Sequence, residues 1–377
     1  MYDAVIADGT ARSPLRAALC SLCVLLAPAL GAAATAGSTG TYVQHNLVSD
    51  GFITADHTDP NLRNPWGLVF GPTTPVWVAN QGALSSTLYD GLGTANPLVV
   101  TIPHDNEAPP VAGPVSVVIT QGTANQFMVT ENGVSGPSLF LFGTLDGNID
   151  GWAPSVDRTS PVIMVDQSLT GLGALFTGLA LGNDGTTTFL YTADFGNSTV
   201  KVFDTNFKQV TLPADAFVDP QVPVDFAPYN IRNIGGALYV VYAPRDRMPG
   251  DGRGMIDVFD TSGNLIKRFE SGAHLNCPWA ITLAPANFGR FSNEILVGNT
   301  GTGKIAAFNP VTGAFDGFLT TTLKNGNVKP LQIDGLLGIE FGNGLLHQPT
   351  NTLFFTAGPF QHLHGLYGTI MPVAATN

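Results

Sequence analysis

The sequence predicts an all-β fold of six repeated sheets, and three observations support this prediction. A short apolar segment, which contains Gly in three of its six copies, recurs along the chain. Each copy is followed by a run rich in Val, Ile, Phe and Tyr, and then by a third strand-like run that often ends in Phe-Asp or Tyr-Asp. A strand-only repeat with a period of about 50 residues is typical of a β-propeller, in which each repeat forms one blade. We therefore expect a six-bladed β-propeller closed by an N-terminal strand. The equivalent positions are Gly67, Ser116, Gly178, Asn230, Ala280 and Gly338, at intervals of 49, 62, 52, 50 and 58 residues.

The inner and second strands of each blade are β-branched and aromatic runs bounded by Gly and Asn, a composition that favours strand over helix. The inner strands are expected at 66–71, 115–120, 177–182, 229–234, 279–284 and 337–342. The second strands are expected at 76–80, 126–130, 189–193, 238–242, 294–298 and 352–356.

The third and outer strands are shorter and less regular. Third strands are expected at 86–90, 139–143, 199–204, 255–260, 304–309 and 365–370. Outer strands are expected at 98–102, 162–166, 265–269 and 315–320. The sixth unit reaches the end of the chain after its third strand, so we expect residues 41–48 to supply its outer strand and to leave no open edge between the first and last blades.

Residues 12–36 have the pattern of a secretory signal: Arg12 and Arg16, an apolar stretch over 17–29, and small residues with cleavage expected after Ala34 or Ala36. The apolar stretch is too short for a transmembrane helix. We therefore divide the chain into a signal peptide with an upstream extension at 1–36 and one propeller domain at 37–377. The expected location is secreted or periplasmic, without stable membrane insertion.

Composition restricts the partners. The chain has a formal net charge of −12, and no cluster of Lys or Arg interrupts this acidic balance. Binding to a phosphate backbone needs a basic surface, so we exclude nucleic acid as a partner. After removal of the signal, Cys277 is the sole remaining cysteine, which forbids an intramolecular disulfide. We expect a monomer.

Asp and Asn residues precede several inner strands and would lie where loops enter the central channel. Convergent carboxylate and amide oxygens suit a hard cation such as calcium. The alternative is that these residues cap turns by accepting backbone N–H bonds. The residues are Asp59, Asn61, Asn64, Asp225, Asn230, Asn276 and Asp334.

Two further sets of side chains belong near the same mouth. Trp66 and Trp279 each follow a Pro at equivalent places; they either pack between blades or form a stacking wall for a sugar or aromatic ligand. His362 and His364 would share one face if their segment is extended, and His57 would join them across the closure to bind zinc or copper. The alternative for each histidine is hydrogen bonding within a loop.

The segment from Asp146 to Gly151 (DGNIDG) matches the opening of a calcium-loop pattern, with Asp157 at the twelfth position. It lies where a hairpin turn is due, and Asp-Gly is a strong turn pair, so we favour a turn. The chain contains no Gly-x-Ser-x-Gly elbow, phosphate loop or dinucleotide fingerprint.

Four runs that flank inner strands carry a resemblance to a known family: 56–67 (DHTDPNLRNPWG), 227–231 (APYNI), 275–279 (LNCPW) and 364–368 (HGLYG). They resemble an uncharacterised family of exported bacterial six-bladed propellers, some of which carry PEP-CTERM sorting tails. The resemblance covers essentially the whole mature chain. It implies the fold and export, but no assigned activity and no catalytic residues.

Three functions remain open from the sequence. The first is a secreted propeller that binds a small molecule, a polysaccharide or a protein at the channel mouth. The second is a metal-dependent hydrolase or lyase, because the Asp and Asn pattern is also similar in architecture to lactonase-type propellers with calcium, or alternatively zinc, in the channel. The third is a structural envelope protein. We favour the binding propeller, since spacing alone names no catalytic base.

Overall fold

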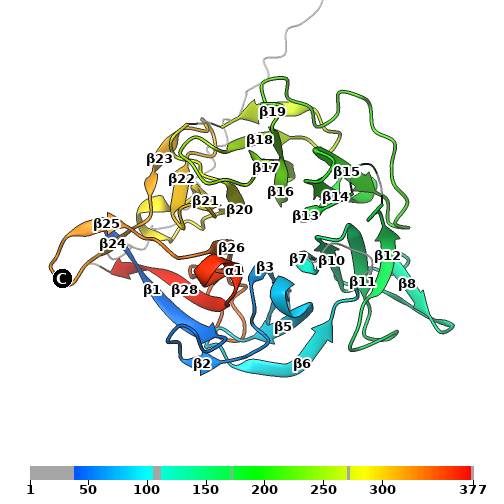
Figure 1. The fold of residues 1–377 in the computed structure, drawn as a ribbon, viewed down its shortest axis with the longest axis horizontal. Coiled ribbons are helices and arrows are strands. Elements are labelled where there is room, and N and C mark those ends of the chain that lie inside the picture. The colour runs from blue at the N-terminus through cyan, green and yellow to red at the C-terminus, as the bar shows by residue number, and fades with distance from the viewer. Residues whose placement is uncertain (1–37, 105–111, 170, 172, 270–271, 375–377) are drawn as a thin grey trace, which may run out of the picture. The chain divides into compact units, whose positions relative to one another are not determined.

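The computed structural model describes residues 38–104, 112–169, 171, 173–269 and 272–374. The proposed signal at residues 12–36 lies outside these residues. Six sheets surround a common centre, and one inner strand of each faces that centre (Figure 1). The fold is the predicted six-bladed β-propeller. Its inner strands are β3 (Pro65–Phe70), β7 (Pro114–Ile119), β13 (Phe176–Asn183), β16 (Phe226–Ile234), β20 (Pro278–Leu283) and β26 (Leu336–Phe341).

Blades 1, 4 and 5 follow the predicted order of four antiparallel strands. Blade 1 continues from β3 through β4 (Val76–Asn80), β5 (Ser85–Tyr89) and β6 (Ala95–Thr101). Blade 4 continues from β16 through β17 (Ala237–Pro244), β18 (Met255–Phe259) and β19 (Leu265–Arg268). Blade 5 continues from β20 through β21 (Ile295–Asn299), β22 (Ile305–Phe308) and β23 (Phe315–Phe318).

Blade 3 has three strands in its sheet: β13, β14 (Thr188–Asp194) and β15 (Thr199–Phe203). The short helical segments are η1 (Gln81–Ala83), η2 (Gly289–Phe291) and α1 (Pro359–His362). None of the helices among the described residues is long and apolar enough to cross a bilayer.

The N-terminal strand closes blade 6, as predicted. Strand β1 (Ser38–Ser49) pairs antiparallel with β28 (Leu366–Ala374), which pairs with β27 (Leu353–Ala357) and so with β26. Figure 1 shows β1 and β28 side by side, in blue and red. The short strand β2 (His57–Thr58) adds to β1 in parallel. The two ends of the ring are therefore held together by a backbone ladder.

Blade 2 corrects one part of the strand assignment. The predicted second strand at 126–130 contributes instead to β8 (Met128–Glu131), which pairs only with β9 (Val134–Pro137) in a separate hairpin. The second strand of the blade is β10 (Phe140–Thr144), which we expected as the third, and the third is β11 (Asn148–Trp152). The outer strand is β12 (Val162–Asp166), as expected. A hairpin and a blade strand share the same alternating pattern, so the pattern does not identify the partner strand.

Glycines on the inner strands bring neighbouring blades close together. A Cβ on Gly178 would lie 2.3 Å from Oδ1 of Asn230 and 2.7 Å from its Cα, on the inner strand of the next blade. A Cβ on Gly338 would lie 2.4 Å from the carbonyl oxygen of Trp66. Larger residues at these positions would push the blades apart, which explains the recurring glycine in the repeat.

Candidate ligand-binding site at the channel mouth

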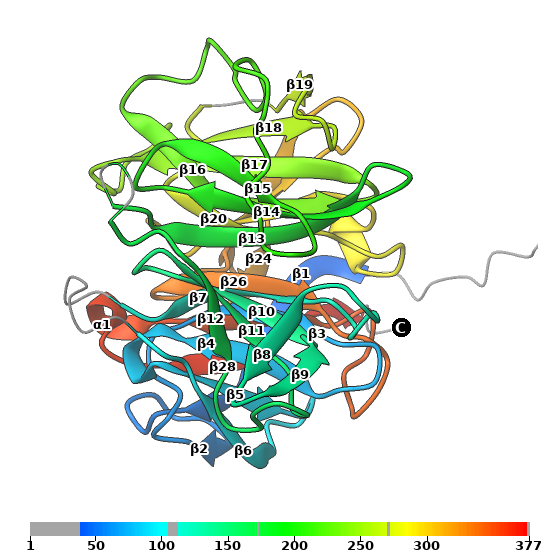
Figure 2. The same cartoon turned by 90° about the vertical axis from the view of Figure 1, so that its right-hand side faces the viewer.

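One end of the ring collects the loops of interest. Because neighbouring strands in a blade are antiparallel, the loop that leads into an inner strand and the loop that joins the second and third strands lie at the same end of the blade. We call this end the mouth. Figure 2 shows the blades from the side, with α1 at one end of the strands. The loops between second and third strands span 81–84, 145–147, 195–198, 245–254, 300–304 and 358–365.

The channel inside the ring is narrow. A cavity of about 30 Å³ lies between the inner strands, lined among others by Asn230, Trp279 and Gly338. This volume is enough for one or two water molecules. Two residues beyond Asn230, Arg232 forms an ion pair with Glu340 of β26, and burial lowers the pKa of Arg232 to about 10. This cavity has no room for a ligand larger than water, so the mouth is the place to look for a larger site.

Trp66 and Trp279 pack against each other below the mouth. Their ring centroids are 5.5 Å apart in a T-shaped arrangement, and Tyr229 lies 6.1 Å from Trp66. The indole N–H of Trp279 donates to the carbonyl oxygen of Thr177 at 3.0 Å. The two tryptophans are 5% and 4% exposed. Such burial favours the packing role, because a stacking wall for a ligand needs an accessible ring face.

Asn64 has a local structural role next to the two tryptophans. Its φ of +44° lies in the left-handed region, directly before Pro65, and Cys277 has φ +47° at the equivalent place before Pro278. The Asn64 amide donates to Oε1 of Gln81 at 2.7 Å, and its Oδ1 lies 3.1 Å from Nδ1 of His362. Asn64 therefore connects the entering loop of blade 1 to the mouth loop of blade 6.

Most oxygens of the predicted Asp and Asn set are already engaged in local contacts. Oδ1 of Asp59 accepts from the backbone N–H of Asn61, and its Oδ2 accepts from the hydroxyl of Tyr89 at 2.8 Å. Oδ1 of Asn276 accepts from the backbone N–H of Gly250 at 2.9 Å. The Asn230 amide donates to the carbonyl oxygen of Trp279 at 2.8 Å. These contacts match the turn-capping alternative.

Asp225 and Asp334 are exposed and belong to different blades. Oδ2 of Asp334 accepts from the backbone N–H of Phe360 at 2.9 Å, which links the entering loop of blade 6 to α1. The structure brings Asn64 next to Trp66, and Asn230 next to Trp279. Asp59 and Asn61 hydrogen-bond to each other, and the backbone carbonyl oxygen of Asp225 accepts from the N–H of Arg245.

The three histidines do not share one face. We expected this segment to be extended. Instead, Phe360, Gln361 and His362 all have positive φ, and the segment turns through α1. His364 pairs with Asp50 at 2.8 Å and stacks on Phe52 with the centroids 3.9 Å apart. His57 lies on the exposed strand β2. Across the residues that the structure describes, no group of three or more His, Cys, Asp and Glu side chains is arranged to hold a metal ion.

His362 lies at the rim of the mouth beside charged groups. Burial lowers its pKa, and the positive charge of Arg247 acts in the same direction, while the negative charge of Asp334 opposes them. These effects together favour the neutral imidazole, and Oδ1 of Asn64 lies 3.1 Å from its Nδ1.

A groove of about 320 Å³ opens at the mouth between blades 5 and 6. One wall is the loop of residues 300–303, which joins β21 and β22. The other wall is the segment that leads into β26. The groove is polar, and Asp334 in its lining accepts from the backbone N–H of Phe360. The lining side chains are those of Thr300, Thr302, Lys329, Gln332, Ile333 and Asp334.

Of the groove residues, sequence reasoning identified only Asp334. Lys329 and Gln332 were missed because they follow an inserted hairpin, β24 (Thr320–Thr322) with β25 (Val328–Pro330). The long interval of 58 residues before Gly338 was the available signal that blade 6 carries an insertion at its entrance.

Comparison with known proteins places the chain among viral relatives. No family model matches it. The chain is 34% identical over 339 residues to the uncharacterized protein R648 of Acanthamoeba polyphaga mimivirus, covering 88% of this chain and 80% of the viral protein. It is 31% identical over 346 residues to the uncharacterized protein L690 of the same virus, covering 89% and 87%. A solved glucose dehydrogenase has a TM-score of 0.50 at 13% identity, covering 89% of this chain and 100% of that chain, a likeness that shows the fold alone.

These relatives correct the resemblance drawn from the sequence. The expected family of exported bacterial propellers was wrong, because the curated relatives are viral proteins. The physical reason lies in the runs that carried the resemblance. Asn64 and Cys277 occupy strained positions before a Pro, and Trp66 and Trp279 pack below the mouth. Such runs reflect the geometry by which a chain enters an inner strand, and this geometry does not depend on the source of the protein.

Proposed function

The chain belongs to the family that includes the mimivirus proteins R648 and L690, and we propose that it is a binding propeller that holds a hydroxyl-rich ligand, such as a sugar or the end of a polysaccharide, in the groove at the mouth. The observation that carries the proposal is the groove between blades 5 and 6. Its volume of about 320 Å³ is at the lower end of the range for small-molecule sites.

The side chains of the groove suit a neutral polar ligand. Thr302 and Gln332 offer both donors and acceptors, which a sugar hydroxyl can use in either sense. Lys329 and Asp334 carry opposite charges, so the groove has no net charge to attract an ion.

The test is binding of a panel of neutral oligosaccharides, measured by isothermal titration calorimetry with wild-type protein and single variants. Gln332→Ala and Lys329→Ala remove groove contacts and are each expected to weaken binding about tenfold. Lys324→Ala is the matched control, because Lys324 lies in the turn of the same hairpin and does not line the groove. Equal loss in Lys324→Ala and Lys329→Ala, or no binding across the panel, would contradict the proposal.

A second candidate, a hydrolase or lyase, is favoured by His362. A neutral imidazole that Asn64 orients at the rim of the mouth has the protonation state of a general base. The discriminating experiment is a hydrolysis and elimination screen with wild type and His362→Gln. Activity that His362→Gln abolishes would favour the enzyme, and oligosaccharide binding without turnover would favour the binding propeller.

Export is part of the proposal and rests on the pattern at residues 12–36. Mass spectrometry of the protein recovered from the medium or periplasm of a bacterial expression host tests it. An N-terminus at residue 35 or 37 is expected, and an uncleaved cytoplasmic chain would contradict export.

A further inference from the structure

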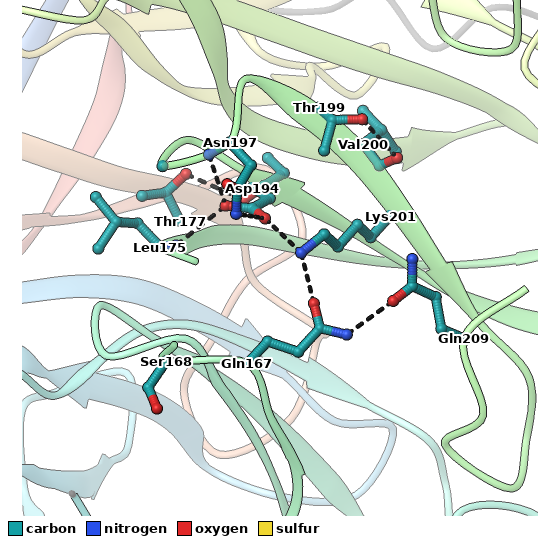
Figure 3. Close-up of polar contacts among 12 residues, drawn as sticks. Gln167, Ser168, Leu175, Thr177, Asp194, Asn197, Thr199, Val200, Lys201 and Gln209 are labelled. Atoms are coloured by element: carbon teal, nitrogen blue, oxygen red, sulfur yellow. Dashed lines mark hydrogen bonds and ion pairs between the residues drawn. The ribbon is translucent and has the colours of Figure 1, made fainter. Parts of the chain in front are cut away.

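Three buried carboxylates among the described residues lie beside a cationic side chain. Figure 3 shows Asp194, which lies at the end of β14 and is fully buried, with Nζ of Lys201 at 2.7 Å from its Oδ2. In blade 4, Arg268 contacts both Asp219 and Asp257. A positive side chain offsets the cost of burying the charges of Asp194 and Asp219, whereas the contact of Asp257 with Arg268 is weaker.

Asp150 of β11 differs from these three carboxylates. It is fully buried, and within the described part of the chain neither of its carboxylate oxygens has a hydrogen-bond or ion-pair partner. The same holds for Oδ1 of Asn148, which is 1% exposed. Three unpartnered oxygens in one buried place need an explanation, because native structures pair such groups with protein, water or an ion.

These oxygens belong to one cluster. Asn148 and Asp150 are two residues apart on β11, so their side chains lie on the same face of the strand. Nδ2 of Asn148 donates to Oδ2 of Asp146 at 3.3 Å, which leaves Oδ1 of Asn148 available. Asp146 and Asp150 are close enough for their charges to repel each other. All three side chains are at most 2% exposed.

We propose that Asp146, Asn148 and Asp150 bind a calcium ion behind the β10–β11 turn at the mouth of blade 2. The ion would neutralise the two carboxylates and supply the missing partner for Asp150 and for Oδ1 of Asn148. Three side chains that offer only oxygen ligands suit calcium, which accepts irregular oxygen shells, better than magnesium, which demands near-ideal octahedral geometry.

The calcium-loop pattern that begins at Asp146 and the turn between β10 and β11 are compatible with each other. Asp146 and Gly147 form the predicted turn between β10 and β11, with Gly147 at φ +79°. Asp157, the twelfth residue of the pattern, is half-buried and accepts from the backbone N–H groups of Thr159 and Ser160. The calcium site is therefore built on a turn and the strand that follows it, and Asp157 is not a ligand.

The test uses the full chain, stripped with a chelator, and follows calcium binding by calorimetry and by the melting temperature. Wild type is expected to bind one calcium ion and to melt about 4 °C higher at a hundredfold excess over Kd. Asp150→Asn keeps the shape and removes one charge. It is expected to lose on the order of 100-fold in affinity, because the affinity of calcium sites depends on the ligand charge count. Asp157→Asn is the matched control and is expected to bind calcium like wild type.

The outcomes decide the proposal. Loss of calcium binding in Asp150→Asn with retention in Asp157→Asn supports it. Absence of calcium binding by wild type overturns it without any variant, as does unchanged binding by Asp150→Asn. A preference for magnesium overturns the identity of the ion. If Asp150→Asn does not fold, as judged by circular dichroism, Asn148→Ser replaces it, and an unchanged affinity in that variant counts against the site.

Discussion

At the residue scale, the protein shows how a buried carboxylate behaves when its cation is distant. Asp257 of β18 is fully buried, and Nε of Arg268 lies 3.4 Å from its Oδ1 without forming a hydrogen bond. Burial therefore dominates and raises the pKa of Asp257 to about 7. Asp219 contacts the same guanidinium closely, so Arg268 is shared unequally between the two carboxylates.

This pKa predicts a pH dependence of stability. A carboxyl whose pKa is raised on folding binds its proton more tightly in the folded state, so its contribution is fully present below about pH 4 and is lost as pH rises through about 7. The loss is on the order of 4 kcal/mol at most. Asp257→Asn cannot ionise and is expected to reduce the fall in stability between pH 5 and pH 8, as measured by urea unfolding.

Asp219→Asn is the comparison for this experiment. It removes the closer carboxylate of Arg268 and is expected to lower stability at both pH values. An unchanged pH slope in Asp257→Asn would show that another group causes the dependence.

Single residues also mark what the sequence could not predict of the site. The candidate role of Asp334 at the mouth was readable, because Asp before an inner strand must lie near the channel entrance. The hydrogen-bond partners of the other Asp and Asn residues at the mouth could not be predicted. Whether Oδ1 of Asn276 faces a ligand or the backbone N–H of Gly250 depends on the path of another loop, and no local pattern encodes that path. The oxygens of Asn148 and Asp150 were readable as a pattern, but their burial without partners was not.

At the element scale, each inner strand depends on a close approach to the next. The strand periods were readable because β-branched and aromatic runs alternate with turns. The two hairpins β8–β9 and β24–β25 were not recognised as insertions, since their strands have the same composition as blade strands. The intervals that contain these hairpins, of 62 and 58 residues, exceed the other intervals by about the length of a hairpin, and this excess length was the available sign of an insertion.

Because the inner strands of blades 3 and 4 lie so close together, adding one methyl group at Gly178 is expected to lower the stability of the protein strongly. Gly178→Ala places a Cβ 2.3 Å from Oδ1 of Asn230 and 2.7 Å from both the Cα of Asn230 and the backbone nitrogen of Ile231. Blades 3 and 4 must therefore separate. We expect a loss of about 2–4 kcal/mol in the free energy of unfolding. Gly236→Ala is the control, because it meets no atom within 4 Å and carries only the strain of φ +90°. Equal losses in the two variants, measured by denaturant unfolding, would argue that blade contact is unimportant at Gly178.

At the scale of the whole molecule, β1 holds the ring closed by more than its ladder with β28. The hydroxyl of Tyr42 donates to the carbonyl oxygen of Phe288 at 2.9 Å and accepts from the backbone N–H of Phe291, both in blade 5. Leu47 and Val48 are buried in the cluster that joins blade 6 to blade 1. One strand therefore connects three consecutive blades. This closure was predictable from the sequence because the sixth unit lacked an outer strand, but the contact of Tyr42 with blade 5 was not.

Deletion of residues 38–49 should consequently destabilise the whole ring. It removes three fully buried apolar side chains, each contributing about 1.5–3 kcal/mol, and exposes the edge of β28. The total is comparable to the free energy of unfolding of a typical domain, about 5–15 kcal/mol. We expect cooperative thermal melting to be lost or to shift strongly downward, with proteolysis spread over all blades. A chain that starts at Ser38 keeps β1 and is the control, expected to melt like the full chain. If the deleted chain instead loses only blade 6 while blades 2 to 4 stay protected from protease, the blades are stable independently, and closure by β1 does not govern the stability of the ring.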